Sequence, residues 1–292
     1  MNDELFKLSE DGTVLIEFIG GDDVTEAIIP ESVTEIRRKA FYWCRSLTSI
    51  KIPESVIKIG YRAFYHCRSL TSINVDANNP YFASIDGILF NKKKTILGIY
   101  PQGNQQPSYE IPKGVTEIGM EAFAGCSSLK SINIPEGVTG IGDGAFYGCK
   151  SLTSISILDN VTEIGKDAFA SCSSLKSITL PENVKEIGEG AFAGCSSLKS
   201  IDIPDSVKKI GERAFNDCYS LTSINVDANN LYFASIDGVL FNKKKTILIK
   251  YPKGKQQTLY NIPDSVTEIG QLAFYGCESL TSISILDNVT EI

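Results

Sequence analysis

The chain has 292 residues, of which 42% are hydrophobic and 22% are charged, a balance typical of an ordered soluble protein. Its formal net charge of −7 argues against a general nucleic-acid binder, which would need a basic face, and gives no reason to expect an anionic membrane as partner. No stretch approaches the roughly 18 apolar residues of a membrane span, so no membrane insertion is expected.

The N-terminal segment, residues 1–28, begins MNDELFKLSEDG, which is acidic and lacks the apolar core of a secretory signal. We therefore expect either a cytoplasmic protein or a chain from which a signal has been removed. The Leu5-Phe6 pair and the Thr-Val-Leu run at 13–15 look like the two arms of half an insertion of the kind found later in the chain. Residues 1–28 are accordingly predicted to form a capping hairpin of a single 1–292 solenoid.

From residue 29 onward the chain repeats the pattern I-P-x-x-V-T-x-I-G-x-x-A-F-x-x-C-x-S-L-x-S-I-x with a period of 23 residues. Regular repeats occupy residues 29–74, 111–225 and 262–292. Complete copies begin at Ile29, Ile52, Ile111, Ile134, Ile157, Leu180, Ile203 and Ile262. The last copy breaks off at residue 292, which favours a fragment or a decayed repeat.

Each part of the repeat has a structural interpretation. Alternation in L-x-S-I-x-I predicts a half-buried strand, which the following Pro ends. V-T-x-I supplies two further inward residues, the next Gly permits a turn, and A-F-x-x-C predicts a short helical or 3₁₀ turn that buries Ala191, Phe192 and Cys195. One unit cannot bury its apolar side, but stacked units can. The predicted fold is thus an α/β repeat solenoid, with a parallel β-sheet on its concave face and helical turns on the other.

Two insertions of 36 residues, 75–110 and 226–261, lengthen the pattern. Both contain D-G-[IV]-L-F-N-K-K-K-T-x-L, which predicts a hairpin. In the first insertion the arms are residues 88–90 and 95–97, and the tip is residues 91–94.

The repeat resembles the BspA-type leucine-rich repeat over about residues 13–292, and the insertions resemble the longer units of that family. Departures are small: Arg37 replaces Gly, and Leu158 and Leu286 replace Pro. The resemblance implies a bacterial surface or secreted protein, or a protist relative, that adheres to host or neighbouring-cell proteins.

One cysteine per repeat invites a chemical interpretation. The positions are Cys44, Cys67, Cys126, Cys149, Cys172, Cys195, Cys218 and Cys277. Metal sites need closer ligand spacings, and parallel side chains on adjacent coils are poorly placed for disulfides. Because free cysteine behaves as a small buried hydrophobe, we expect a structural core ladder and no cofactor.

No catalytic constellation is evident, so an enzyme is not expected. His66 is the only histidine, and equivalent positions in other repeats tolerate Trp, Gly, Ser and Asp, which indicates an exposed turn. The glutamates of V-T-E-I recur once per coil (Glu35, Glu117, Glu163 and Glu268), whereas a glycosidase needs one unique pair.

The outward positions of the predicted strands are candidate binding residues for a protein or glycan. The first is always serine: Ser49, Ser72, Ser131, Ser154, Ser177, Ser200, Ser223 and Ser282. The second varies: Lys51, Asn74, Asn133, Ser156, Thr179, Asp202, Asn225 and Ser284. A hydroxyl ladder that only keeps the sheet hydrated is an equal alternative, since small side chains offer few hot-spot anchors.

The hairpin tips offer a second candidate surface, comprising Lys92, Lys93, Lys94, Lys243, Lys244 and Lys245. Charged tips also protect strand edges from aggregation, which is the simpler interpretation. The leading hypothesis is therefore a non-enzymatic interaction module. A structural spacer, the recognition domain of a larger and enzymatic protein, and a hydroxyl array for a repetitive surface such as ice or polysaccharide are the alternatives.

Overall fold

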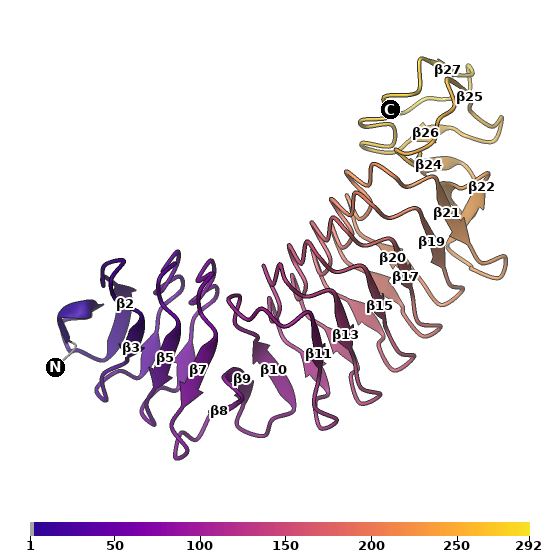
Figure 1. Cartoon of the computed structure of the whole chain (residues 1–292). Helices are drawn as coiled ribbons and strands as arrows, with labels where there is room; N and C mark the ends of the chain where they lie inside the picture. Colours follow the sequence, from indigo (N-terminus) through magenta and orange to yellow (C-terminus); the bar gives the residue numbers. More distant parts are fainter. Residues whose placement is uncertain (1–2) are drawn as a thin grey trace.

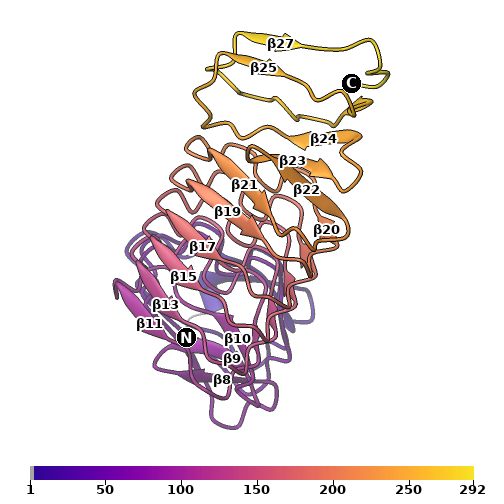
Figure 2. The same ribbon diagram turned by 90° about the vertical axis from the view of Figure 1, so that its right-hand side faces the viewer.

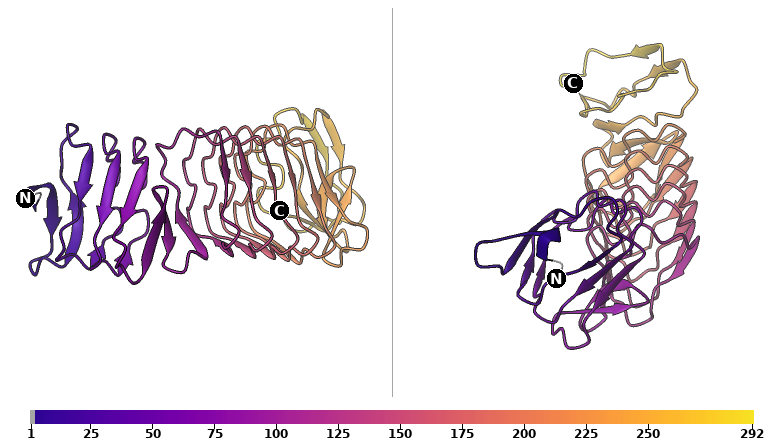
Figure 3. Two further views of the ribbon diagram at one scale, coloured as in Figure 1. Left: turned by 60° about the horizontal axis from the view of Figure 1, so that its bottom comes forward. Right: turned by 60° about the vertical axis from the view of Figure 1, so that its left-hand side comes forward.

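The computed structural model describes residues 3–292, and its ribbon is a curved rod of stacked coils with the two termini at opposite ends (Figure 1). Turned about the horizontal axis, the rod again shows the coils following one another from the N-terminus (Figure 3, left). Strand pairing has a constant offset, for example Ser154 opposite Ser177 and Ile164 opposite Ile187. This offset confirms the predicted 23-residue coil.

A first row of parallel strands contains the S-I-x segment of each repeat. Ile155 points inward and is buried, as are most of its equivalents, while the flanking positions are exposed or half-buried. The row consists of β3 (Glu26–Ile28), β5 (Ser49–Ile52), β7 (Ser72–Val75), β11 (Ser108–Glu110), β13 (Ser131–Asn133), β15 (Ser154–Ser156), β17 (Ser177–Thr179), β19 (Ser200–Ile203), β21 (Ser223–Val226), β25 (Leu259–Asn261) and β27 (Ser282–Ser284).

A second row, which the sequence interpretation did not separate, contains the V-T-x-I segments. Between the insertions its strands pair parallel from coil to coil, as Glu117 does with Gly140. The row consists of β2 (Val14–Phe18), β4 (Glu35–Ile36), β6 (Lys58–Ile59), β10 (Ile96–Ile99), β12 (Glu117–Ile118), β14 (Gly140–Ile141), β16 (Glu163–Ile164), β18 (Glu186–Ile187), β20 (Lys209–Ile210), β24 (Ile247–Lys250) and β26 (Glu268–Ile269). The pairing is interrupted after β6 and after β20.

The two rows lie on opposite flanks of the rod, as Figure 2 shows for β11 to β21 on one side and β20 and β24 on the other. The A-F-x-x-C turns lie along the inner edge of the curve, and the Pro turns lie along its outer edge (Figure 1). The serine-bearing strands therefore form a flank, and their predicted placement on the concave face is wrong. Backbone hydrogen bonds join the coils at the inner turns and keep them close there.

The predicted helical turns are also corrected. Among residues 3–292 the helical segment is a 3₁₀ turn, η1 (Asp3–Leu5), so the fold is a β-solenoid and not α/β. In the third coil the N–H groups of Glu121, Phe123 and Gly125 donate to carbonyls of the next coil at 2.9, 2.7 and 2.7 Å. Donors used between coils are not free to build a helix within one coil. Left-handed φ angles of 54° and 75° at Glu121 and Gly125 also interrupt helical geometry.

Each insertion adds an antiparallel element to the second row. The first insertion contains β8 (Phe82–Ile85) and β9 (Ile88–Asn91), which pair with each other, and β9 pairs antiparallel with β10. The second contains β22 (Phe233–Ile236) and β23 (Val239–Asn242), and β23 pairs with β24 in the same way. The lysine tips therefore join β9 to β10 and β23 to β24.

The N-terminal end is closed by β1 (Phe6–Leu8), which pairs antiparallel with β2. β2 in turn pairs parallel with β4 of the first coil. Phe6 and Phe18 continue the apolar core to the end of the stack at a ring distance of 5.7 Å. Residues 1 and 2, which belong to the predicted cap, lie outside the described residues.

The apolar core is divided at the insertions into three clusters. Within a block the A-F phenylalanines stack, with ring centroids 5.2 Å apart for Phe41–Phe64 and for Phe123–Phe146. Among residues 3–292 no aromatic contact joins Phe64 to Tyr100, which begins the next stack at 5.1 Å from Phe123. The first insertion therefore leaves a break in the core.

Candidate functional site

The serine row is exposed, as the sequence predicted. Five of the eight serines are exposed, and Ser49, Ser72 and Ser223 are half-buried. The variable second positions are all exposed: Lys51, Asn74, Asn133, Ser156, Thr179, Asp202, Asn225 and Ser284. The structure thus brings these side chains onto one flank, while their role in binding stays a prediction.

The row is not continuous along the rod. The turn between β8 and β9 lies against β7, where the Ile73 N–H donates to the Gly87 carbonyl at 2.8 Å. A Cβ added at Gly87 would lie 2.9 Å from the Ser72 Cα, so only glycine fits this approach. The second insertion repeats the arrangement at Gly238 and Ser223. The serine platform is consequently split into three blocks.

The lysine tips lie along the outer edge of the rod. Lys92 Nζ donates to the Ala77 carbonyl at 2.9 Å, and Lys243 Nζ donates to the Ala228 carbonyl at 3.1 Å. Lys93, Lys94, Lys244 and Lys245 are exposed. One lysine per tip thus fastens the hairpin to its own insertion, and the others project into solvent.

The eight cysteines are free thiols, and six of them are buried. Each buried thiol donates to the phenylalanine or tyrosine carbonyl of the preceding coil, as Cys172 Sγ does to the Phe146 carbonyl at 3.1 Å. Burial raises the pKa of Cys172 well above its usual value and that of Cys218 to about 12. These groups are therefore poor nucleophiles and poor metal ligands in the folded chain.

The inner turns of the first two coils carry a surface that the sequence interpretation missed. We call it the basic–aromatic patch; it comprises Arg37, Arg38, Lys39, Tyr42, Trp43, Arg45, Tyr61, Arg62, Tyr65, His66 and Arg68. Trp43 is 42% exposed and Tyr61 is 40% exposed. Within residues 3–292, Arg62 is the one basic residue of the patch that forms an ion pair. The patch is therefore positively charged on a chain whose net charge is −7.

The aromatic rings of the patch pack across the two coils. The ring centroids of Trp43 and His66 are 4.8 Å apart, and those of Tyr65 and His66 are 4.2 Å apart. The Arg45 guanidinium lies 4.2 Å from the centroid of the Trp43 ring. Burial and the charge of the nearby arginines lower the pKa of His66, which favours its neutral form. The result is a pre-ordered cluster of aromatic and guanidinium groups.

The sequence contained a signal for this patch. Variation at the position of His66 indicates only an exposed turn when that position is compared on its own. Compared unit by unit, R-R-K-A-F-Y-W-C-R and G-Y-R-A-F-Y-H-C-R stand apart from G-K-D-A-F-A-S-C-S and similar later units. Basic and aromatic side chains occur together at several positions of both of these units.

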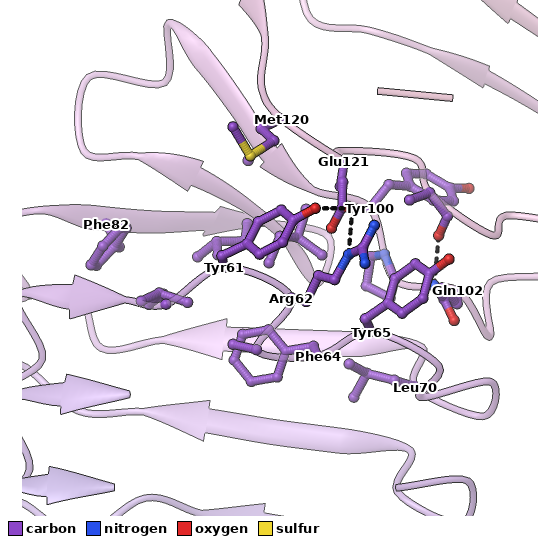
Figure 4. A pocket seen from close by; sticks show the side chains of 18 residues that line it. Tyr61, Arg62, Phe64, Tyr65, Leu70, Phe82, Tyr100, Gln102, Met120 and Glu121 are labelled. Carbon is purple, nitrogen blue, oxygen red and sulfur yellow. Dashed lines mark hydrogen bonds and ion pairs between the residues drawn. The ribbon is translucent and has the colours of Figure 1, made fainter. Parts of the chain in front are cut away.

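A cavity of about 360 Å³ lies beside the patch, at the break in the core left by the first insertion (Figure 4). Phe64, Leu70, Phe82 and Met120 form apolar walls, and Arg62 enters from the patch. The size is at the lower end of the roughly 300–1,000 Å³ of typical ligand pockets. The cavity and the patch therefore form one continuous candidate site.

An ion pair crosses this cavity from the second coil to the third. Arg62 Nε is 2.6 Å from Glu121 Oε1, and the Tyr61 hydroxyl donates to the same oxygen at 2.9 Å (Figure 4). The Arg62 guanidinium also lies 4.8 Å from the Tyr61 ring centroid and 5.0 Å from that of Tyr65. Burial raises the pKa of Tyr65 to about 12, so its hydroxyl stays neutral and can donate.

Comparison with known proteins identifies the repeat. The family model described as the BspA type leucine-rich repeat region, in six copies, matches residues 17–105, 101–222, 141–258 and 245–292. The chain belongs to the BspA-type leucine-rich repeat family. No curated protein sequence matches it.

Solved structures of similar proteins come from several bacteria. A leucine-rich repeat protein of Eubacterium ventriosum has 30% identity and a TM-score of 0.69, over 90% of this chain and 66% of that one. A leucine-rich cell surface protein of Faecalibacterium prausnitzii has 30% identity and a TM-score of 0.56, over 95% and 70%. The pneumococcal vaccine antigen PcpA has 26% identity and a TM-score of 0.61, over 90% and 68%. The chain thus spans about two thirds of the length of each.

In the part of the chain that the structure describes, residues 3–292, no helix is long and apolar enough to cross a membrane. Over the same residues no group of three or more His, Cys, Asp and Glu side chains is placed to hold a metal ion.

Proposed function

We propose that this chain is an interaction module that binds a protein partner at a cell surface, with the basic–aromatic patch as its main contact surface. The observation that carries the proposal is the composition of the patch. Trp, Tyr and Arg are the residue types that dominate binding energy at protein interfaces, and here they are pre-ordered and exposed. Related structures described as a cell surface protein and a vaccine antigen support the location.

Backbone strain gives a second argument. Trp43 and His66 have left-handed φ angles of 68° and 66°, at a position where four other coils have glycine. A bulky residue in this conformation costs about 1–2 kcal/mol, and glycine removes that cost. Stability alone therefore favours glycine at both positions. The large rings are better explained by contact with a partner than by folding.

The charge of the patch indicates the kind of partner. Arg37, Arg38, Lys39, Arg45 and Arg68 have no acidic partner among residues 3–292. A positive patch on an acidic molecule attracts an acidic surface and repels a second basic one. We therefore propose an acidic protein surface as the partner.

The serine row remains a proposed secondary surface. Its side chains are small, and some already bond to each other, as Asn225 Nδ2 does to Asp202 Oδ1 at 2.8 Å. A hollow of about 390 Å³ beside Thr179, Asp202 and Asn225 makes this part of the serine row concave. The exposed lysine tips remain a proposed contact at the outer edge.

The experiment uses a panel of immobilised cell-surface and matrix proteins as the probe, with Trp43→Gly as the test variant. We expect a panel protein to bind the wild-type chain, and Trp43→Gly to lower its affinity at least ten-fold. Unfolding of the variant should require about 1 kcal/mol more, because strain is relieved. If binding survives Trp43→Gly unchanged, the patch is not the contact surface.

The double variant Asn133→Arg with Asp202→Arg is the matched control on the flank. Both positions are exposed, so the fold should tolerate the change. We expect a few-fold loss of affinity if the serine row contributes and a much larger loss only if it is the main surface. A chain that binds no member of the panel would favour the spacer interpretation.

A further inference from the structure

At the first insertion a row of backbone N–H groups that would otherwise donate to the next coil has no acceptor among residues 3–292; we call this row the open ladder. In regular coils the three N–H groups at the positions of Glu121, Phe123 and Gly125 all donate to the next coil. The equivalent groups of the second coil are those of Arg62, Phe64 and His66. Within residues 3–292 these three N–H groups donate to no acceptor.

The three donors face the position of the next coil, as their equivalents Lys39, Phe41 and Trp43 do when they donate from the first coil to the second. Arg62 and His66 have φ angles of 57° and 66°. The N–H groups of Ala63 and Tyr65 between them donate within their own coil, so the three open donors form an edge that faces the position of the next coil. Arg62 and Phe64, which carry two of the three donors, line the cavity. The open ladder, the cavity and the basic–aromatic patch therefore adjoin one another, and Arg62 belongs to all three.

We propose that this open edge takes an extended acidic segment of the partner protein. The segment's carbonyl or carboxylate oxygens accept from the N–H groups of Arg62, Phe64 and His66, and one apolar side chain fills the cavity. Arg68 follows these donors on the same turn, Arg45 lies on the equivalent turn of the first coil, and both would pair with carboxylates of the segment. The inference rests on the proposed function and adds to it the binding mode and the chemistry of the partner segment.

A peptide suits the edge better than a small anion or a sugar. The vacant acceptor positions repeat the spacing at which this chain's own coils present carbonyls, which an extended peptide can reproduce. The apolar walls of Phe64, Leu70 and Phe82 exclude a carboxylate but accommodate an aliphatic or aromatic side chain. The basic side chains continue over two coils, well beyond the cavity.

The second insertion provides a natural control. There Lys250 occupies the position of Ile99, and its Nζ donates to Asn216 Oδ1 at 3.1 Å and to the Leu272 carbonyl at 2.9 Å. Ile249 stands where the first insertion has Gly98. The chain's own lysine therefore enters the second cavity, which measures about 260 Å³.

The test copies these residues into the first site as Gly98→Ile and, separately, Ile99→Lys. An added Cβ at Gly98 lies 3.3 Å from the Leu89 carbonyl oxygen, which a small shift accommodates, and Ile99→Lys covers the case in which Gly98→Ile does not fold. The probe is a synthetic peptide of glutamates flanking one central leucine. Control probes replace the leucine with alanine or the glutamates with lysines.

We expect the glutamate–leucine peptide to bind and to shift the amide resonances of Arg62, Phe64 and His66. Each variant should weaken binding roughly ten-fold or more, as loss of one buried leucine predicts. Glu121→Gln should strengthen it a few-fold, because the carboxylate that competes for Arg62 is removed. A purely structural role of Glu121 would not raise affinity.

Several results would overturn the inference. These are equal binding of the leucine and alanine peptides, binding unaffected by both Gly98→Ile and Ile99→Lys, or binding of a sulfated polysaccharide in place of any peptide. If Trp43→Gly abolishes binding of a panel protein while the cavity variants leave it intact, the proposed function stands and the inference fails. If Trp43→Gly leaves protein binding unchanged, the proposed function fails.

Discussion

The two insertions have almost the same sequence and the same backbone, yet they leave different sites beside them. Both interrupt the aromatic stack and the coil-to-coil ladder, after Phe64 in one case and after Phe215 in the other. In the second, Lys250 extends into the gap and bonds to groups on both sides. In the first, Ile99 leaves an apolar cavity that the Arg62–Glu121 pair spans.

The difference teaches that the insertion itself creates the break and that a few side chains decide whether it stays open. Tyr65 and Glu121 in the first site correspond to Asn216 and Leu272 in the second. Asn216 and the Leu272 carbonyl hold the lysine, whereas Tyr65 and Glu121 hold an arginine that belongs to the patch. Repetition of the backbone therefore does not imply repetition of the site.

The largest effect is expected where the insertions are alike. Asn79 is fully buried; its Nδ2 donates to the Pro53 and Val56 carbonyls at 2.9 and 2.8 Å, and its Oδ1 accepts from the Tyr81 and Phe82 N–H groups. Asn79→Ala leaves these groups without partners and should lower the free energy of unfolding by about 3 kcal/mol or more.

Asn230 makes the same four hydrogen bonds in the second insertion, so Asn230→Ala should cost about as much in urea denaturation. Much smaller destabilisation by one of the two would show that the insertions differ in their backbone anchoring as well as in their cavities.

A smaller, pH-dependent effect is expected at Lys250. Burial lowers the pKa of its amine below the usual 10.5, so the unfolded chain binds this proton more tightly than the folded chain. The stability of the wild type relative to Lys250→Met should therefore rise as pH increases toward 10.5. The check is urea unfolding of both chains from neutral to alkaline pH. A difference that stays constant over this range would contradict the assigned burial of the amine.

The smallest effect concerns the reactivity of thiols at the two ends of the ladder. Cys44 and Cys277 are half-buried, and contact with the Cys67 thiol lowers the pKa of Cys44, while burial raises that of Cys277. We expect a thiol reagent near pH 8 to label Cys44 first, then Cys277, and the six buried thiols only after denaturation. Rapid labelling of most of the eight in the native chain would refute the core-ladder assignment.

Much of the fold follows from the pattern alone. The strict recurrence of the repeat predicted the coil length, the half-buried strand, the buried Ala191, Phe192 and Cys195, and the outward serines. These features are predictable because alternation and periodicity are local properties. The prediction of a helical turn was wrong. The A-F-x-x-C spacing is typical of one helical turn only if its backbone N–H groups bond within the same coil. In the stack those donors bond to the next coil.

The sequence by itself therefore determined the coil, its register and its buried residues. Only the tertiary structure decided which edge of the rod is the inner one. It also decided that Arg62 contacts Glu121, 59 residues further along the chain, and that the N–H groups of Arg62, Phe64 and His66 have no acceptor from a neighbouring coil within residues 3–292. The physical reason is that the residues of one repeat determine the structure of one coil only. What a coil lacks depends on what lies next to it, and after residue 74 the next element is an insertion instead of another repeat.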